Sequence, residues 1–211
     1  MTSLARAERV ALIDLLTTLG PDAPTLCEGW TTHDLAAHLV VRERRPHAVP
    51  GLVVPALHGV TAALERRMRP TAYDDLLAAL RSGPPAWSPV GLPGPLYDPA
   101  NLHEFYVHHE DVRRLVEPGP RAATPGLDDA LWSRLRVLAP VFTRRADGLG
   151  LTLVRPDARS TRARRGGEEL VLRGTARELF LWMWGRRGAA DVRVEGLPAA
   201  VERLALTRIG P

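Results

Sequence analysis

Glu104 and His108 lie four residues apart in a stretch whose apolar residues have helical spacing. Side chains four positions apart on an α-helix differ by only about 40° in direction, so this carboxylate and this imidazole could hold one ion together. A zincin motif is excluded, because His103 and His108 are five residues apart and would diverge by about 140°. The spacing alone also fits an exposed pair on the surface of a helix.

A third metal ligand would have to come from another helix, and His38 is the best candidate. It lies between Leu35 and Leu39 on the apolar face of a helix expected over residues 33–45, with Thr32 as its N-cap. Two histidines and one carboxylate suit zinc, although other divalent metals also fit, and three protein ligands leave a position open. The alternative is a core histidine with a purely structural role.

The other residues near these three allow weaker inferences. His109 should point about 100° away from His108, which suggests a place beside the ligands or on the surface. Asp111 follows His108 by three residues and could orient its ring. Cys27 could be a nucleophile near a helix N-terminus, but buried packing is the favoured interpretation. The remaining histidines are expected on the surface or in loops: His33, His47, His58 and His103.

The first part of the chain reads as helical. Apolar periodicity and Pro or Gly breaks predict helices over 4–19, 33–45, 53–68, 73–82, 98–115 and 127–145. Asp98 and Pro99 resemble a cap followed by a first-turn proline. Residues 83–101 contain six prolines and three glycines, which indicates a long irregular loop that could act as a lid.

After residue 148 the pattern changes to short runs with a period of two. We expect strands over 150–155, 160–164, 169–172 and 191–195, and helices over 176–184 and 198–206. The predicted fold class is therefore α+β. A bundle of four main helices, residues 1–146, would hold the metal, and a small α+β domain, residues 147–211, would follow it.

Composition restricts the function classes. The 211 residues contain one cysteine, so a disulfide scaffold is excluded and a reducing, cytoplasmic location is expected. Neither a signal peptide nor a membrane span is indicated, because charges interrupt the first 20 residues and Pro, Gly and His interrupt residues 46–64. All 28 basic residues are arginine. They form no run of five like charges and are not interleaved with aromatic residues, so nucleic-acid binding is disfavoured.

Two segments resemble a known family. LCEGWTTHDLAAHL, residues 26–39, and EFYVHHED, residues 104–111, resemble the DinB-like superfamily, specifically its mycothiol-dependent maleylpyruvate isomerase branch in actinobacteria. The continuation over residues 42–46 is similar to an actinobacterial metal-binding subfamily of that group. The resemblance implies that His38, Glu104 and His108 bind the metal, and that the open position takes a low-molecular-weight thiol, mycothiol.

That resemblance implies a zinc-dependent enzyme in which a metal-bound thiolate adds to a small electrophile. Isomerisation and S-transfer both remain open, as do a monomer and a homodimer. The alternative is a non-catalytic, metal-stabilised binding or regulatory module, because one fold can host different functions.

Overall fold

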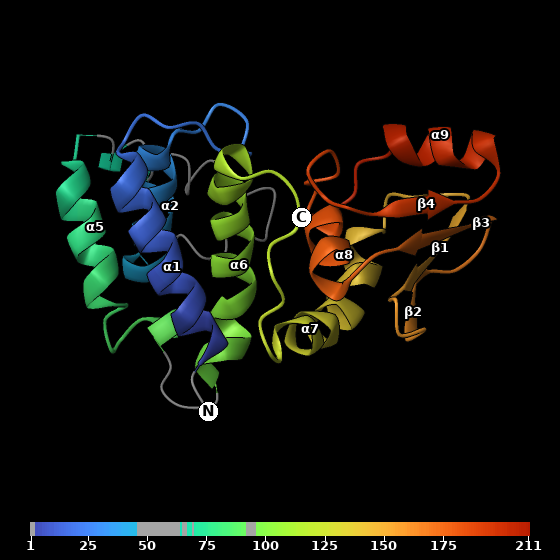
Figure 1. Ribbon diagram of the computed structural model, residues 1–211, viewed down its shortest axis with the longest axis horizontal. Coiled ribbons are helices and arrows are strands. Elements are labelled where there is room, and N and C mark those ends of the chain that lie inside the picture. Colours follow the sequence, from blue (N-terminus) through green and yellow to red (C-terminus); the bar gives the residue numbers. More distant parts are fainter. Residues whose placement is uncertain (1–2, 46–63, 65–66, 69, 92–95) are drawn as a thin grey trace. The chain divides into compact units, whose positions relative to one another are not determined.

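The computed structural model describes residues 3–45, 64, 67–68, 70–91 and 96–211, and the chain divides into two compact units, Met1–Glu117 and Pro118–Pro211 (Figure 1). The predicted helix over 53–68 lies outside the described residues, apart from residues 64, 67 and 68. Among the described residues, no helix is both long enough and apolar enough to cross a membrane.

The first unit is helical. Within its described part, the α-helices are α1 (Leu4–Leu19), α2 (Thr32–Arg44), α5 (Tyr73–Ser82) and α6 (Tyr97–Val116), with a short 3-10 turn at Pro89–Gly91. The α1 helix packs mainly on α6, and α2 packs on α5 (Figure 1). Fully buried leucines and Phe105 fill the space between the helices, so apolar burial holds the two site-bearing helices, α2 and α6, in place.

The N-termini of two helices differ from the sequence prediction. Thr31 caps α2 instead of Thr32, and its hydroxyl and the Asp34 carboxylate form a reciprocal capping box. Asp98 does not cap its own helix: its carboxylate accepts hydrogen bonds from the backbone N–H groups of Leu4 and Ala5, at 3.0 and 3.3 Å, and therefore caps α1. The local sequence could not show this role, because the two partners are more than 90 residues apart.

Part of the proline-rich segment is ordered by α6. The Asn101 side-chain amide donates to the carbonyl oxygens of Val90, at 2.8 Å, and Tyr97, at 3.0 Å. These bonds attach the 3-10 turn to the first turns of the helix. A lid function for this segment stays a prediction.

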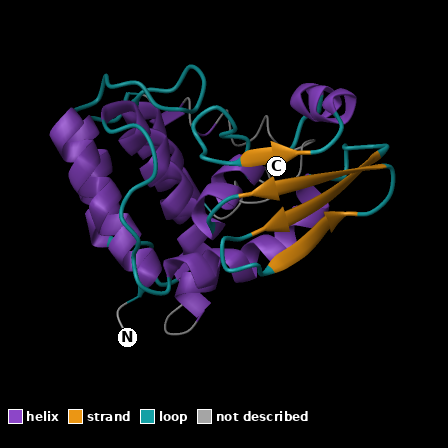
Figure 2. Ribbon diagram, turned by 45° about the vertical axis from the view of Figure 1, so that its right-hand side comes forward, coloured by secondary structure: helices purple, strands orange, loops and turns teal. Residues whose placement is uncertain are grey.

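The second unit is a small α+β structure. Its elements are α7 (Leu127–Phe142), β1 (Leu149–Val154), β2 (Ser160–Arg164), β3 (Glu168–Arg173), α8 (Ala176–Met183), β4 (Arg193–Glu195) and α9 (Pro198–Leu206). The strands form one sheet in the order β2-β1-β3-β4 (Figure 2). The β1 strand pairs antiparallel with β2 and parallel with β3, and β4 is antiparallel to β3.

The observed division lies earlier than the predicted boundary between residues 146 and 147. The α7 helix, which we expected in the helical bundle, belongs to the second unit because it packs on α8 and on β2. Its inward residues Leu131, Leu135 and Ala139 are fully buried. The amphipathic pattern correctly predicted a helix with one buried face, but it could not tell which partner covers that face.

Tyr73 links α5 to α1, and its ionisation should weaken the fold. Its hydroxyl donates to the carbonyl oxygen of Leu16 at 2.9 Å, and burial raises the pKa of Tyr73 to about 12 from its usual 10.0. Because the folded-state pKa lies above the unfolded value, the stabilisation is complete below about pH 10 and is lost as the pH rises towards 12. In urea titrations near pH 8, Tyr73→Phe should lower the free energy of unfolding by about 1 kcal/mol. The difference between the two proteins should shrink above pH 10. A difference that stays constant above pH 10 would contradict the raised pKa of Tyr73 in the folded protein.

Candidate metal centre

The structure brings His38, Glu104 and His108 together between α2 and α6. His38 Nε2 lies 3.1 Å from Glu104 Oε1, and His108 Nε2 lies 3.4 Å from the same oxygen. The three potential ligand atoms all lie within 4.8 Å of one another. Glu104 and His108 meet because they are one helical turn apart, and His38 reaches them from the facing helix, as the sequence predicted.

These separations fit the edges of a tetrahedral metal site. Zinc binds nitrogen and carboxylate oxygen at about 2.0–2.2 Å, so two ligand atoms of a tetrahedral site are about 3.3–3.5 Å apart. The distances of 3.1 and 3.4 Å lie close to that range. An ion could therefore replace the hydrogen bonds with small shifts of the side chains.

His108 is oriented by a buried carboxylate one turn further along α6. Its Nδ1 lies 2.9 Å from Asp111 Oδ2, and Asp111 is fully buried. An Nδ1–H group that donates to that carboxylate orients the ring so that Nε2 faces Glu104. The prediction that Asp111 could orient a ligand histidine agrees with this contact.

Arg42 lies beside Glu104, a role that the sequence analysis missed. Its Nε is 3.7 Å from Glu104 Oε1, and its other nitrogens donate to Asn101 Oδ1 and to the Ala100 carbonyl oxygen, at 2.9 and 2.8 Å. Because Arg42 follows His38 by four residues, the spacing that places two side chains on one helix face was the available signal.

The charges around the cluster favour an ionised carboxylate. Burial alone would raise the pKa of Glu104, but the positive charge of Arg42 and hydrogen bonds with His108 and His38 outweigh it and hold this pKa well below its usual value. Burial would likewise lower the pKa of His108, but hydrogen bonds with Asp111, Cys27 and Glu104 hold it well above its usual value. The Glu104 carboxylate is thus negatively charged at neutral pH.

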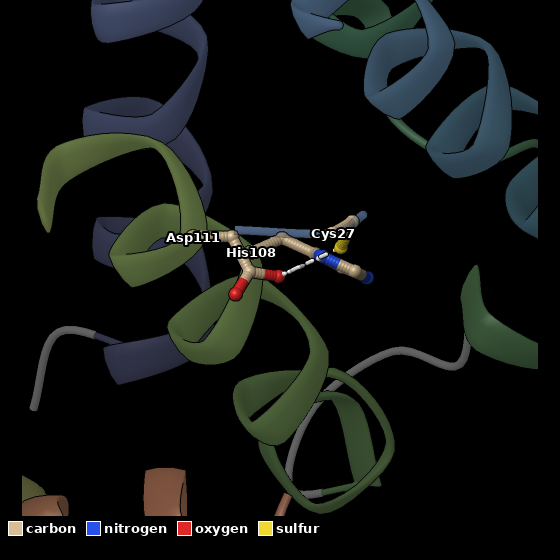
Figure 3. Close-up of side chains that lie close together, drawn as sticks. All are labelled: Cys27, His108 and Asp111. Carbon is tan, nitrogen blue, oxygen red and sulfur yellow. Dashed lines mark hydrogen bonds and ion pairs between the residues drawn. The ribbon is translucent and has the colours of Figure 1, made fainter. Parts of the chain in front are cut away.

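Cys27 contacts this cluster instead of packing in an apolar core. It is half-buried, and its thiol donates to Asp111 Oδ2 at 3.2 Å (Figure 3). The loop that carries it is attached to α6, because the Leu26 N–H group donates to the carbonyl oxygen of Asp111 at 2.9 Å. Sequence spacing gave no signal for this contact, which joins residues 84 positions apart.

Aromatic packing covers another part of the cluster. The centroid of the Trp30 ring lies 5.1 Å from the centroid of the His38 ring, and the centroids of the His38 and His108 rings are 5.2 Å apart. Trp30 therefore packs directly on one of the three candidate ligands.

Among the described residues, His33, His103 and His109 do not join the cluster. His109 is buried, and its Nδ1 lies 2.9 Å from Glu8 Oε2 on α1, so it is neither beside the ligands nor on the surface. His33 Nε2 lies 3.0 Å from the Thr71 carbonyl oxygen, and its ring stacks on Tyr73. His47 and His58 lie outside the described residues.

The sequence identifies the family. Residues 3–113, more than half of the chain, match the mycothiol maleylpyruvate isomerase N-terminal domain, and the chain belongs to this family. The matched region contains all three residues of the His38–Glu104–His108 cluster. A search of curated proteins found no match.

Two solved structures share the fold over nearly the whole chain. A mycothiol-dependent maleylpyruvate isomerase is 20% identical, with a TM-score of 0.57 and coverage of 91% of this chain and 90% of that chain. A histidine-to-alanine mutant of a mycothiol-dependent maleylpyruvate isomerase is 17% identical, with a TM-score of 0.54 and the same coverage. At these identities the similarity establishes a common α+β fold, with a helical N-terminal region followed by a small sheet domain.

Proposed function

We propose that this chain is a mycothiol-dependent enzyme whose divalent metal, zinc, is held by His38, Glu104 and His108. The observation that carries the proposal is the convergence of three ligand atoms within 4.8 Å, from two helices that the apolar core fixes. Membership of the mycothiol maleylpyruvate isomerase family supports mycothiol as the thiol that this enzyme uses. Three protein ligands leave one position of a tetrahedral ion for that thiol, whereas a structural zinc site is closed by four.

The roles of the side chains follow from their contacts. Glu104 would supply a negative ligand and His38 and His108 neutral nitrogens, while Asp111 holds the His108 ring with Nε2 facing the centre. Arg42 keeps the Glu104 carboxylate ionised. When bound, the ion would lower the pKa of the thiol and supply a nucleophilic thiolate at neutral pH. The thiolate would add to a small electrophile, for isomerisation or S-transfer.

A pocket near α2 favours an anionic electrophile. It has a volume of about 210 Å³ and is lined by Val41, Arg45, Leu64, Arg67 and Met68. Val41 follows His38 by three residues, so the backbone rises by about 4.5 Å along α2 between the two positions. Two guanidinium groups beside apolar side chains suit a small molecule that carries a carboxylate.

Calorimetric titration with mycothiol tests the proposal. In the protein as purified, the cluster of His38, Glu104 and His108 is expected to hold one zinc ion and to bind mycothiol with release of the thiol proton. Metal-stripped protein and His38→Ala should not bind it. Equal binding by loaded and stripped protein would contradict the proposal. Incubation of the loaded protein with mycothiol and maleylpyruvate should then yield product, whereas binding without any conversion would favour the non-catalytic binding module.

Asp111→Asn should weaken zinc binding by the cluster of His38, Glu104 and His108 without removing one of these three ligands. The neutral amide cannot hold the Nδ1–H group of His108 as the carboxylate does, and loss of such an orienting partner typically costs 10- to 100-fold in metal affinity. We expect a zinc dissociation constant higher by about that factor in chelator competition. Asp74→Asn, a change of an exposed carboxylate on α5, is the matched control and should leave the constant unchanged.

A further inference from the structure

A second set of potential ligands lies on the other side of the His108 ring. Cys27 Sγ, a ring nitrogen of His108 and a carboxylate oxygen of Asp111 all lie within 4.8 Å of one another (Figure 3). Asp111 Oδ2 is 2.9 Å from His108 Nδ1 and 3.2 Å from Cys27 Sγ. This set uses Nδ1 of the ring, whereas the cluster with His38 and Glu104 uses Nε2.

Two donors converge on one oxygen in this set. The Nδ1–H group and the S–H group both point to Asp111 Oδ2, which is fully buried. If both protons leave, a thiolate, a ring nitrogen and a carboxylate surround the same space. The negative charges of the thiolate and the carboxylate would balance one divalent cation, and buried charges of this kind are stable when they coordinate a metal.

The loop is held in place before any ion binds. The Leu26 N–H group attaches it to the Asp111 carbonyl oxygen, the Cys27 N–H group donates to Thr25 Oγ1 at 3.2 Å, and the Trp30 N–H group donates to the Cys27 carbonyl oxygen at 3.0 Å. Cys27 is therefore positioned by its own backbone as well as by its thiol. Such preorganisation reduces the entropy lost when a ligand binds.

We propose that Cys27 Sγ, His108 Nδ1 and Asp111 Oδ2 form a second metal site, which takes a thiophilic divalent cation such as zinc or cobalt(II). Thiolate and imidazole ligands select such ions over magnesium or calcium. Around a tetrahedral zinc ion, nitrogen and oxygen ligand atoms would be about 3.3–3.5 Å apart and sulfur about 3.5–3.7 Å from either, so the set has to widen by a few tenths of an ångström. The His108 ring would bridge the two sites, with its second proton released on binding. The proposal is independent of mycothiol and of any catalytic activity.

Cobalt(II) titration of the metal-stripped full chain tests the second site. A thiolate bound to cobalt(II) gives a near-ultraviolet charge-transfer band that oxygen and nitrogen ligands do not give. The chain contains one cysteine, so the band can arise only from Cys27, provided that a phosphine reductant replaces thiols in the buffer. The wild-type protein is expected to bind two equivalents of cobalt and to show this band.

Two variants separate the second site from the cluster of His38, Glu104 and His108. Cys27→Ser should bind one equivalent without the band, and Glu104→Gln should bind one equivalent with the band retained. If the wild type saturates without the band, or if Glu104→Gln loses it, the second site is refuted. A wild-type protein that shows the cobalt band but binds only one equivalent of metal and no mycothiol would instead refute the proposed function and leave the second site standing. Circular dichroism checks that each variant is folded. If a variant does not fold, the cobalt band and stoichiometry of the wild type still test the proposal.

Discussion

Glu104→Ala should lose the metal proposed to be held by His38, Glu104 and His108. Glu104 is the one negatively charged member of the proposed ligand set, and its Oε1 lies within 3.4 Å of both histidine Nε2 atoms. Orienting residues alone change metal affinity by 10- to 100-fold, so loss of a direct ligand should weaken zinc by at least about 100-fold. Elemental analysis of protein purified without chelator should therefore show about one zinc per chain fewer than in the wild type, and mycothiol-dependent turnover should disappear with it.

Glu202→Ala is the control for this prediction, because Glu202 is an exposed glutamate on a helix of the other unit. It should keep the wild-type zinc content. A Glu104→Ala protein that retains the full zinc content in chelator competition would exclude Glu104 as a ligand. Removal of a carboxylate also leaves Arg42 without this neighbour, so the thermal unfolding of both variants should be compared before the zinc values are interpreted.

Glu110→Ala should destabilise the protein by about 3–5 kcal/mol. Glu110 is fully buried on α6, and its carboxylate accepts hydrogen bonds from Arg113, at 2.8 and 3.0 Å, and from Arg114 Nε at 2.6 Å. Truncation would leave two largely buried guanidinium groups without this shared counter-charge. Removing one partner of a buried ion pair typically lowers the free energy of unfolding by about 3–5 kcal/mol. Urea unfolding followed by circular dichroism measures the loss.

Glu117→Ala is the matched control for Glu110→Ala. Glu117 also pairs with Arg113, at 4.0 Å, but its side chain is 82% exposed. An exposed pair of this kind contributes less than about 1 kcal/mol. If both variants lose a similar amount of unfolding free energy, burial of the Glu110 carboxylate does not determine how much it stabilises the fold.

The convergence of His38, Glu104 and His108 could be predicted because it depends on short-range periodicity. Four-residue spacing placed Glu104 and His108 on one side of a helix, and the apolar neighbours of His38 placed it towards the interior. Arg42 could also have been predicted, because it follows His38 by four residues. Cys27 could not, because its contact with Asp111 depends on how a loop packs against a helix far along the chain.

The fold shows the same limit. Most helices and strands begin and end within a few residues of the predicted positions, since apolar periodicity and Pro or Gly breaks act locally. The assignment of α7 to the helical bundle was less successful. Its buried face would have fitted either unit, and only its packing on α8 and β2 decides between them. Asp98 is a similar case, because an acid before a proline resembles a cap of the helix that follows it.

The strand order gives the arginines of the second unit a role in solubility. Because β2 and β4 each pair with only one neighbour, each leaves an unpaired edge at which another chain could add a strand. Arg162 and Arg164 lie on β2, and Arg193 begins β4. Charged side chains on open edges oppose the joining of sheets from different molecules. Replacing these residues with threonine should therefore increase aggregation during folding and at high protein concentration. The free energy of unfolding of the folded chain should change less.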